Sequence, residues 1–240
     1  MNWGNVWNVS LDTGFFVALA SIFIINIILS GDNAVVIAMA VRSLGPKQRL
    51  RGIVIGTAGA VLLRIVLTFF CAKLLEIPLL KFLGGALITW IAVKLFVEGG
   101  AGDENQKEVH TLGKAVVTIL VADLVMSLDN VLGVAGACKG NLLLLVIGLG
   151  TSIPIVVFGS NILSKLMDRF PIIVLLGAAV LGRVAGEMVI GDPFITKIFR
   201  PGEVTSYVVQ AMFTVGVIVA GKVWMKWKVS NASPEIDASS

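Results

Sequence analysis

The sequence predicts an all-α, polytopic membrane protein of about seven transmembrane helices, built as a 3+3 inverted repeat followed by a C-terminal helix. Three observations predict this fold. Of the 240 residues, 57% are hydrophobic and only 14% are charged, whereas ordinary soluble domains contain about 25% charged residues. Apolar segments near the ~20 residues needed to cross a bilayer recur along the chain. One polar pattern occurs twice, inside two such segments.

The composition indicates a single membrane domain over residues 1–240. A soluble core of this size could not hide so much apolar surface. The longest polar stretch, Glu98–Lys114, is too short to fold alone. The formal net charge of +4 comes from Lys and Arg in short loops, so it orients the protein in the membrane and does not indicate nucleic acid as a partner. Cys71 and Cys138 lack metal-ligand spacing and are interpreted as small buried hydrophobic residues.

The first expected span, Gly14–Val41, is longer than one crossing requires. Its extra length leaves room for a break at Ser30-Gly31-Asp32-Asn33, because Ser, Asp and Asn are good helix N-caps. A half-helix starting there would expose backbone groups to an ion at mid-membrane, as transporters do. The second span, Gly52–Cys71, carries Arg64, which we expect to neutralise a buried acid.

The remaining spans are expected at Pro78–Val97, Lys114–Ala137, Asn141–Leu163, Ile172–Ile190 and Val204–Lys222. The sixth carries Arg183 and Glu187 one helical turn apart, which we expect to pair with each other. Trp224 and Trp227 follow the seventh and are typical of an anchor at the membrane interface.

A duplication relates the two halves of the chain. With a shift of 97, four polar positions of the first span coincide with four of the fourth: Asn26 with Asp123, Ser30 with Ser127, Asp32 with Asp129, and Asn33 with Asn130. With a shift of 93, Pro78-Leu-Leu-Lys-Phe-Leu-Gly84 aligns with Pro171-Ile-Ile-Val-Leu-Leu-Gly177. The repeats are therefore expected at 14–98 and 114–190, with an additional helix at 204–227. Because each repeat crosses the membrane three times, the two enter from opposite sides and are inverted.

Positive charge alternates between the connections and predicts the orientation. One side holds eleven basic residues (Arg42, Lys47, Arg49, Arg51, Lys107, Lys114, Lys165, Arg169, Lys222, Lys226 and Lys228), and the other holds five (Lys73, Lys81, Lys139, Lys197 and Arg200). The protein is therefore expected in the cell membrane with its N-terminus outside and its C-terminus cytoplasmic.

The duplicated polar residues are the candidate metal site: Asp32, Asn33, Asp129, Asn130, Asp123, Asn26, Ser30 and Ser127. A carboxylate in mid-span costs roughly 2.5–3.5 kcal/mol on insertion scales, so intramembrane acids mark ion paths by default. On an unbroken helix Asp32 would lie away from the stripe of Asn26, Ser30 and Asn33, so either the helix breaks or the two faces serve different partners. Asp123 could be a third ligand, a proton carrier or an acid hydrated from the cytoplasm.

The chemistry of the candidate ligands narrows the choice of ion. Carboxylate, amide and hydroxyl groups are hard oxygen donors, which suit Mg²⁺, Ca²⁺ or Mn²⁺ and argue against Zn²⁺ or Cu⁺. Two carboxylates balance a divalent charge, although a proton or Na⁺ could also use paired acids. No resident cofactor and no enzymatic activity are expected.

Two pieces of the chain resemble the TerC family of integral membrane proteins, within the LysE-type transporter superfamily: Leu29-Ser-Gly-Asp-Asn-Ala-Val-Val-Ile-Ala38 and Met126-Ser-Leu-Asp-Asn-Val-Leu132. The resemblance implies a seven-span fold, with Asp32, Asn33, Asp129 and Asn130 as the family's acidic membrane motif. It also implies efflux of Mn²⁺ or a related metal, with protons as a candidate counter-ion. Some relatives are linked to tellurite resistance, and others are discussed as partners of the secretion machinery that supply metal to exported proteins.

Two other functions compete with metal export. The first is a non-transporting accessory factor, for tellurite resistance or for metalation and assembly of exported proteins. The second is an intramembrane aspartyl protease, which also needs two membrane acids but usually has a Gly-x-Gly-Asp frame that Asp32 and Asp129 lack. A second copy of the chain and the secretion machinery are the protein partners left open.

Overall fold

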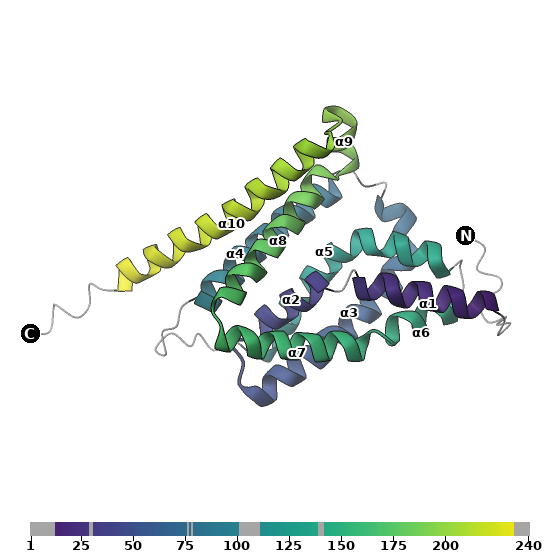
Figure 1. Ribbon diagram of the computed structural model, residues 1–240, viewed down its shortest axis with the longest axis horizontal. Coiled ribbons are helices and arrows are strands. Elements are labelled where there is room, and N and C mark those ends of the chain that lie inside the picture. The colour runs from purple at the N-terminus through teal and green to yellow at the C-terminus, as the bar shows by residue number, and fades with distance from the viewer. Residues whose placement is uncertain are drawn as a thin grey trace, which may run out of the picture.

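The computed structural model describes residues 13–28, 31–75, 77, 79–100, 111–138 and 142–232. All secondary structure in these ranges is helical (Figure 1). The helices are α1 (Thr13–Ile28), α2 (Gly31–Val41), α3 (Pro46–Leu75), α4 (Leu80–Gly100), α5 (Leu112–Cys138), α6 (Leu142–Gly150), α7 (Ile153–Arg169), α8 (Ile172–Ile190), α9 (Pro193–Phe199) and α10 (Glu203–Ala232).

Within the described part of the chain, five helical stretches are long and apolar enough to cross a membrane: Pro46–Thr68, Leu80–Gly99, Leu143–Arg169, Ile172–Ile190 and Glu203–Lys228. They correspond to the second, third, fifth, sixth and seventh expected spans. The first expected span is divided between the shorter helices α1 and α2, and the fourth lies in α5. The structure thus bears out an all-helical membrane fold.

The helices pack in pairs that join the two halves of the sequence. Helix α3 packs along α5, α4 along α8, α1 along α6, and α2 along α7. Helix α10 lies on the outside of α8 and α4, and runs from α9 towards the C-terminus (Figure 1). Each of these pairs, apart from those with α10, joins one helix from residues 14–98 with one from 114–190.

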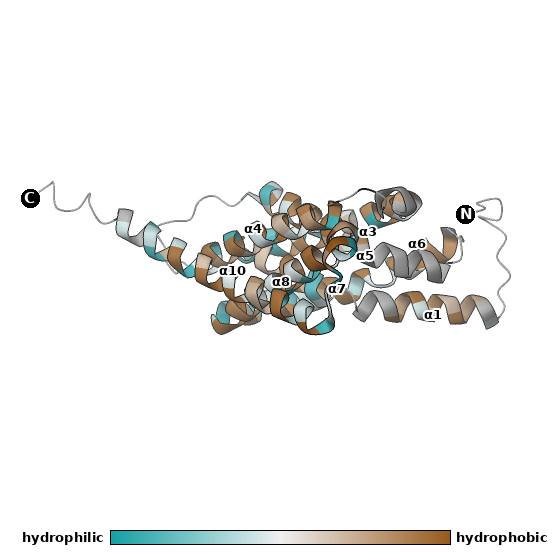
Figure 2. Cartoon of the chain, turned by 90° about the horizontal axis from the view of Figure 1, so that it is seen from above, coloured by the Kyte–Doolittle hydropathy of each residue, from teal (hydrophilic) through white to brown (hydrophobic). Residues whose placement is uncertain are grey.

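Apolar side chains fill the interior and also cover the outside, as expected of a protein surrounded by lipid. Ile53, Ile88 and Leu181 are fully buried. Phe158 and Val204 are instead 68% and 78% exposed. Hydrophobic positions dominate the lengths of the helices in Figure 2, while polar ones gather at the end of α10 near the C-terminus. Removal of water from interior side chains therefore cannot alone explain the packing, and close helix contact must contribute.

The contact between α8 and α10 depends on glycine. A Cβ atom added at Gly182 would lie 2.8 Å from Cα of Thr214, and one added at Gly186 would lie 2.8 Å from Cα of Gln210. The two glycines are four residues apart, which is the small-xxx-small spacing that lets membrane helices approach closely. The backbone of α10 therefore lies directly against that of α8.

Polar contacts mark two ends of the helix bundle. At one end, Asp168 at the end of α7 pairs with Arg42 (Nε to Oδ1, 3.3 Å) and with Arg49. At the other, Asp192 accepts hydrogen bonds from the backbone N–H of Phe82 at 3.2 Å and of Phe194 at 2.9 Å, and so caps α9 and ties it to the start of α4. These two sets of contacts thus lie at different ends of the bundle.

Candidate cation site

A buried ion pair lies where α3 and α5 pack together. Nη2 of Arg64 pairs with Oδ1 of Asp123, and Nε of Arg64 donates to Oδ2 of the same carboxylate at 3.2 Å. The Arg64 side chain is 8% exposed and that of Asp123 is 5% exposed. This contact confirms the expectation that Arg64 neutralises a core acid. It also accounts for Asp123, whose role the sequence left open: its charge is balanced within the protein.

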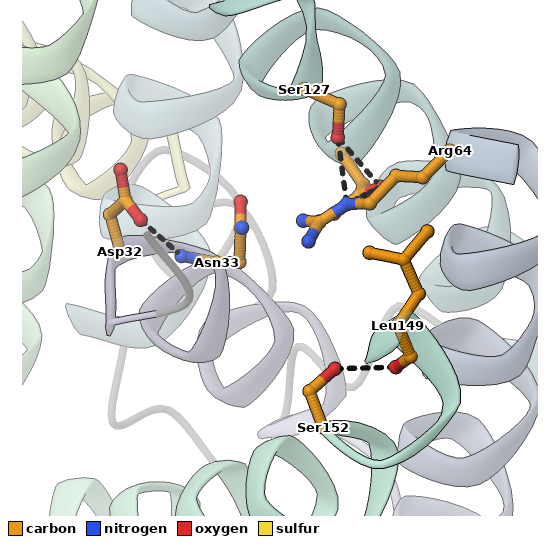
Figure 3. Close-up of polar contacts among 7 residues, drawn as sticks. Asp32, Asn33, Arg64, Ser127, Leu149 and Ser152 are labelled. Atoms are coloured by element: carbon orange, nitrogen blue, oxygen red, sulfur yellow. Dashed lines mark hydrogen bonds and ion pairs between the residues drawn. The ribbon is translucent and has the colours of Figure 1, made fainter. Parts of the chain in front are cut away.

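Ser127 completes this group one helical turn further along α5. Its hydroxyl accepts a hydrogen bond from Nε of Arg64 at 2.9 Å and donates one to Oδ2 of Asp123 at 3.1 Å (Figure 3). Ser127 is fully buried. The hydroxyl therefore holds the guanidinium and the carboxylate in one geometry, as a buried ion pair requires if it is to offset its desolvation.

Asp32 and Asn33 lie at the start of α2, across from Arg64 and Ser127 (Figure 3). The backbone N–H of Asn33 donates to Oδ1 of Asp32 at 3.0 Å. Asp32 is half-buried, and among the described residues the charges of Arg64 and Glu187 act on it. The amino end of a helix favours a carboxylate because the unpaired N–H groups there carry partial positive charge. The start of α2 thus stabilises the Asp32 carboxylate.

The first expected span is divided between two described helices just before this acid. Helix α1 ends at Ile28 and α2 begins at Gly31. Leu29 and Ser30 lie outside the described residues. The final carbonyl groups of α1 have no partners within their own helix, and they carry the negative end of its dipole. Carbonyl groups at the end of such a helix are suited to a cation.

A second interruption, between α6 and α7, was not predicted from the sequence. Pro154 has no N–H, so the carbonyl of Gly150 loses its usual helical partner. Ser152 sits at the turn, is buried, and donates from its hydroxyl to the carbonyl of Leu149 at 2.7 Å (Figure 3). The run Gly148-Leu-Gly150-Thr-Ser-Ile-Pro154 is the signal that could have identified it. The two interrupted spans lie side by side, α1 on α6 and α2 on α7.

The remaining candidate residues are only partly within the described structure. The side chains of Asn26, Asp129 and Asn130 and the whole of Ser30 lie outside it. Helix α5 runs without interruption through residues 129 and 130. Asp129 is six residues beyond Asp123, which is about 9 Å along a helix. Among the described residues, no group of three or more His, Cys, Asp or Glu side chains is placed to hold a metal. Approach of Asp32 to Asp129 stays a prediction.

Arg183 and Glu187 form the expected pair on α8, with Nη2 and Oε2 3.8 Å apart. Their side chains are nevertheless 65% and 59% exposed, which is unusual for charged groups in a membrane span. Nε of Arg183 also donates to Oε1 of Gln210 on α10 at 3.3 Å. The pair thus lies on the side of α8 that meets α10, and the Glu187 charge also acts weakly on Asp32.

Comparison with known proteins places the chain in one group. The family described as "Integral membrane protein TerC family" matches residues 11–230. An "Uncharacterized membrane protein YjbE" of Bacillus subtilis (strain 168) is 36% identical, with 89% of this chain and 97% of the relative aligned. A "UPF0053 inner membrane protein YgdQ" of Escherichia coli (strain K12) is 24% identical, covering 84% of this chain and 90% of the relative. No solved structure matches the chain.

Proposed function

The chain belongs to the TerC family of integral membrane proteins, and from that premise we propose that it transports a divalent metal ion, most simply Mn²⁺, out of the cytoplasm. The proposed site contains the two Asp-Asn pairs, Asp32-Asn33 and Asp129-Asn130. Protons are the proposed coupling ion. The proposal makes the protein a transporter and not an enzyme.

The observation that carries the proposal is the position of Asp32. This acid is half-buried at the start of α2, in the second helix of the first expected span, and no arginine or lysine forms a salt bridge with it in the described structure. Asp123, by contrast, is already paired with Arg64. Placing a carboxylate in a membrane span costs free energy. An acid kept there without a paired arginine or lysine is therefore available to bind a transported cation.

Charge balance shows how a divalent ion would be held. Arg64 cancels Asp123, so Asp32 and Asp129 are the acids of the duplicated motif that remain for the ion. Together they supply the two negative charges that a divalent ion requires. Amide oxygens from Asn33 and Asn130 would add neutral oxygen ligands. These hard donors favour Mn²⁺, Mg²⁺ or Ca²⁺. When no metal is bound, protonation of the same two acids would lower the free-energy cost of keeping them buried.

The pairing of helices supports an inverted repeat around this site. If α1–α2, α3 and α4 are equivalent to α5, α6–α7 and α8, a two-fold axis exchanges the α3–α5 contact with the contact of α1–α2 on α6–α7. The α4–α8 contact maps onto itself. Transporters with this symmetry place their ion sites near the midplane at the repeat interface. The polar residues described here come from both halves.

Metal content and membrane abundance, measured together, test the proposal. We expect Asp32→Asn and Asp129→Asn each to insert normally and to abolish Mn²⁺ efflux, because the swap keeps the shape and removes the charge and the proton acceptor. Glu203→Gln, the same chemical change at the exposed start of α10, is the matched control and should leave efflux unchanged.

The other outcomes are informative. Normal abundance with normal efflux in both Asp variants would rule out the site. Loss of membrane abundance would indicate that the acids are structural and that removing them leaves a buried arginine without a partner. If the purified wild-type protein moves no divalent cation into vesicles, while its deletion still alters exported metalloproteins, the accessory-factor function is correct.

A further inference from the structure

Two serines on α7 have buried hydroxyl groups with no hydrogen-bond partner among the described residues. Ser160 and Ser164 are fully buried, and neither Oγ has a partner. Other hydroxyls in these helices behave differently: those of Thr68, Thr89 and Thr214 donate to the carbonyl four residues earlier. An unsatisfied buried hydroxyl destabilises a fold, and alanine would avoid the penalty. These two side chains therefore need an explanation other than packing.

The position of Ser160 and Ser164 on α7 suggests an explanation. Ser160 lies eight residues after Ser152, which is about 12 Å along the helix from the interruption beside Asp32 and Arg64. Asp168 follows Ser164 by a further helical turn and is the residue that pairs with Arg42 and Arg49. The two hydroxyls thus occupy the stretch of α7 between the candidate site and the polar contacts at one end of the bundle.

The helices that pack against α7 also carry polar groups in this segment. Helix α7 packs against α2, which carries Asp32 in its first turn and ends next to Arg42, and against α3, which carries Arg64. On α3, Thr57 lies seven residues before Arg64, towards the same end, and its buried hydroxyl also has no partner in the described structure. Buried hydroxyls without a partner in the described structure therefore come from two helices that pack together, and they lie in the same segment of the bundle.

We propose that Ser160, Ser164 and Thr57 line a path for water and cations from the Asp32 site to the end of α7, and that the Asp168 contacts with Arg42 and Arg49 close that path in this conformation. The identity of the cation rests on the proposed transport function. Hydroxyl oxygens are neutral hard ligands that can replace water around a divalent cation without trapping it. While Asp168 holds the two guanidinium groups in place, their positive charge also repels a cation at the mouth of the path.

Access of a charged thiol reagent to cysteines on α7 tests the path directly. In a Cys71→Ala/Cys138→Ala background, Ser160→Cys and Ser164→Cys are exposed to a membrane-impermeant, positively charged methanethiosulfonate, with and without Asp168→Asn. Phe158→Cys, on the outward face of the same helix, is the matched control. We expect Asp168→Asn to raise the reaction rate at positions 160 and 164 by about tenfold or more, since it weakens charge-assisted hydrogen bonds. The control should not change.

Failure of the path and failure of the transport function give different results. Thiol access requires no metal, so unreactive cysteines at both positions in folded protein, with or without Asp168→Asn, would overturn the path even if Asp32→Asn abolishes efflux. Ser160→Ala/Ser164→Ala supplies a second test. We expect unchanged or higher thermal stability together with slower Mn²⁺ flux. Unchanged flux would mean that the hydroxyls have no part in transport and would also overturn the path.

Discussion

Arg64 of α3 and Asp123 of α5 are separated by 59 residues in sequence, yet their side chains form a buried ion pair that Ser127 also contacts. The pair joins the two halves of the chain at the candidate site. It leaves Asp32 on the neighbouring helix α2 without a salt bridge in the described structure, although Arg64 is within electrostatic range. Under the proposed transport function, the acid that pairs with the arginine determines which acid is left to bind the metal ion.

Removing one partner of the Arg64–Asp123 pair should lower the stability of the protein. We expect Arg64→Met to lower the free energy of unfolding by about 3–5 kcal/mol, because it leaves the Asp123 carboxylate buried and uncompensated. The double variant Arg64→Met/Asp123→Asn should recover part of that loss. Thermal unfolding in detergent measures both. Lys94→Met, which removes a half-exposed partner of Glu98 at 3.9 Å, is the control and should have little effect. Losses that simply add in the double variant would contradict the pairing.

The glycines between α8 and α10 should not tolerate a methyl group. We expect Gly182→Ala or Gly186→Ala to destabilise the protein by about 1–3 kcal/mol, since the added Cβ meets backbone atoms of α10 that cannot rotate away. Gly216→Ala, on α10 with open space around it, is the matched control and should be neutral or slightly stabilising. Equal melting temperatures for all three variants would show that α10 does not pack closely on α8.

Glu187 should assist cation binding by its charge without being a ligand. We expect Glu187→Gln to raise the Mn²⁺ concentration for half-maximal flux by about two- to tenfold at low salt and by less at high salt, because exposed charges are screened. The maximal rate should change little. Flux assays in vesicles at two ionic strengths provide the measurement. A loss of maximal rate that is independent of salt would instead place Glu187 in the site itself.

The orientation of the protein can be checked independently of transport. The excess of basic residues predicts a cytoplasmic C-terminus and an outside N-terminus. A fusion at Ser240 to a reporter that is active only in the cytoplasm should be active. Activity of the outer-compartment reporter alone at that position would reverse the predicted orientation, and with it the end of the path that the Asp168 contacts close.

Several features of the fold follow from local sequence alone. Long apolar runs between charged loops predict membrane helices, because a bilayer leaves the backbone no partner except itself. The sequence left room for a helix break before Asp32, because Ser30-Gly31-Asp32-Asn33 combines capping residues with an overlong span, and the structure describes separate helices up to Ile28 and from Gly31. The Arg183–Glu187 pair was predictable as well, because residues four apart on a helix are neighbours whatever the rest of the chain does.

Other features depend on how the helices pack. The sequence identified Arg64 as the partner of an acid, but several membrane acids were candidates, and only the contact between α3 and α5 selected Asp123. The exposure of Arg183 and Glu187 depends on which side of α8 the neighbouring helices cover. The unpartnered hydroxyls of Ser160 and Ser164 become visible only when α2 and α3 bury that face of α7. Residue type and spacing determine what each helix can offer, while the tertiary contacts determine which groups satisfy one another and which remain for an ion.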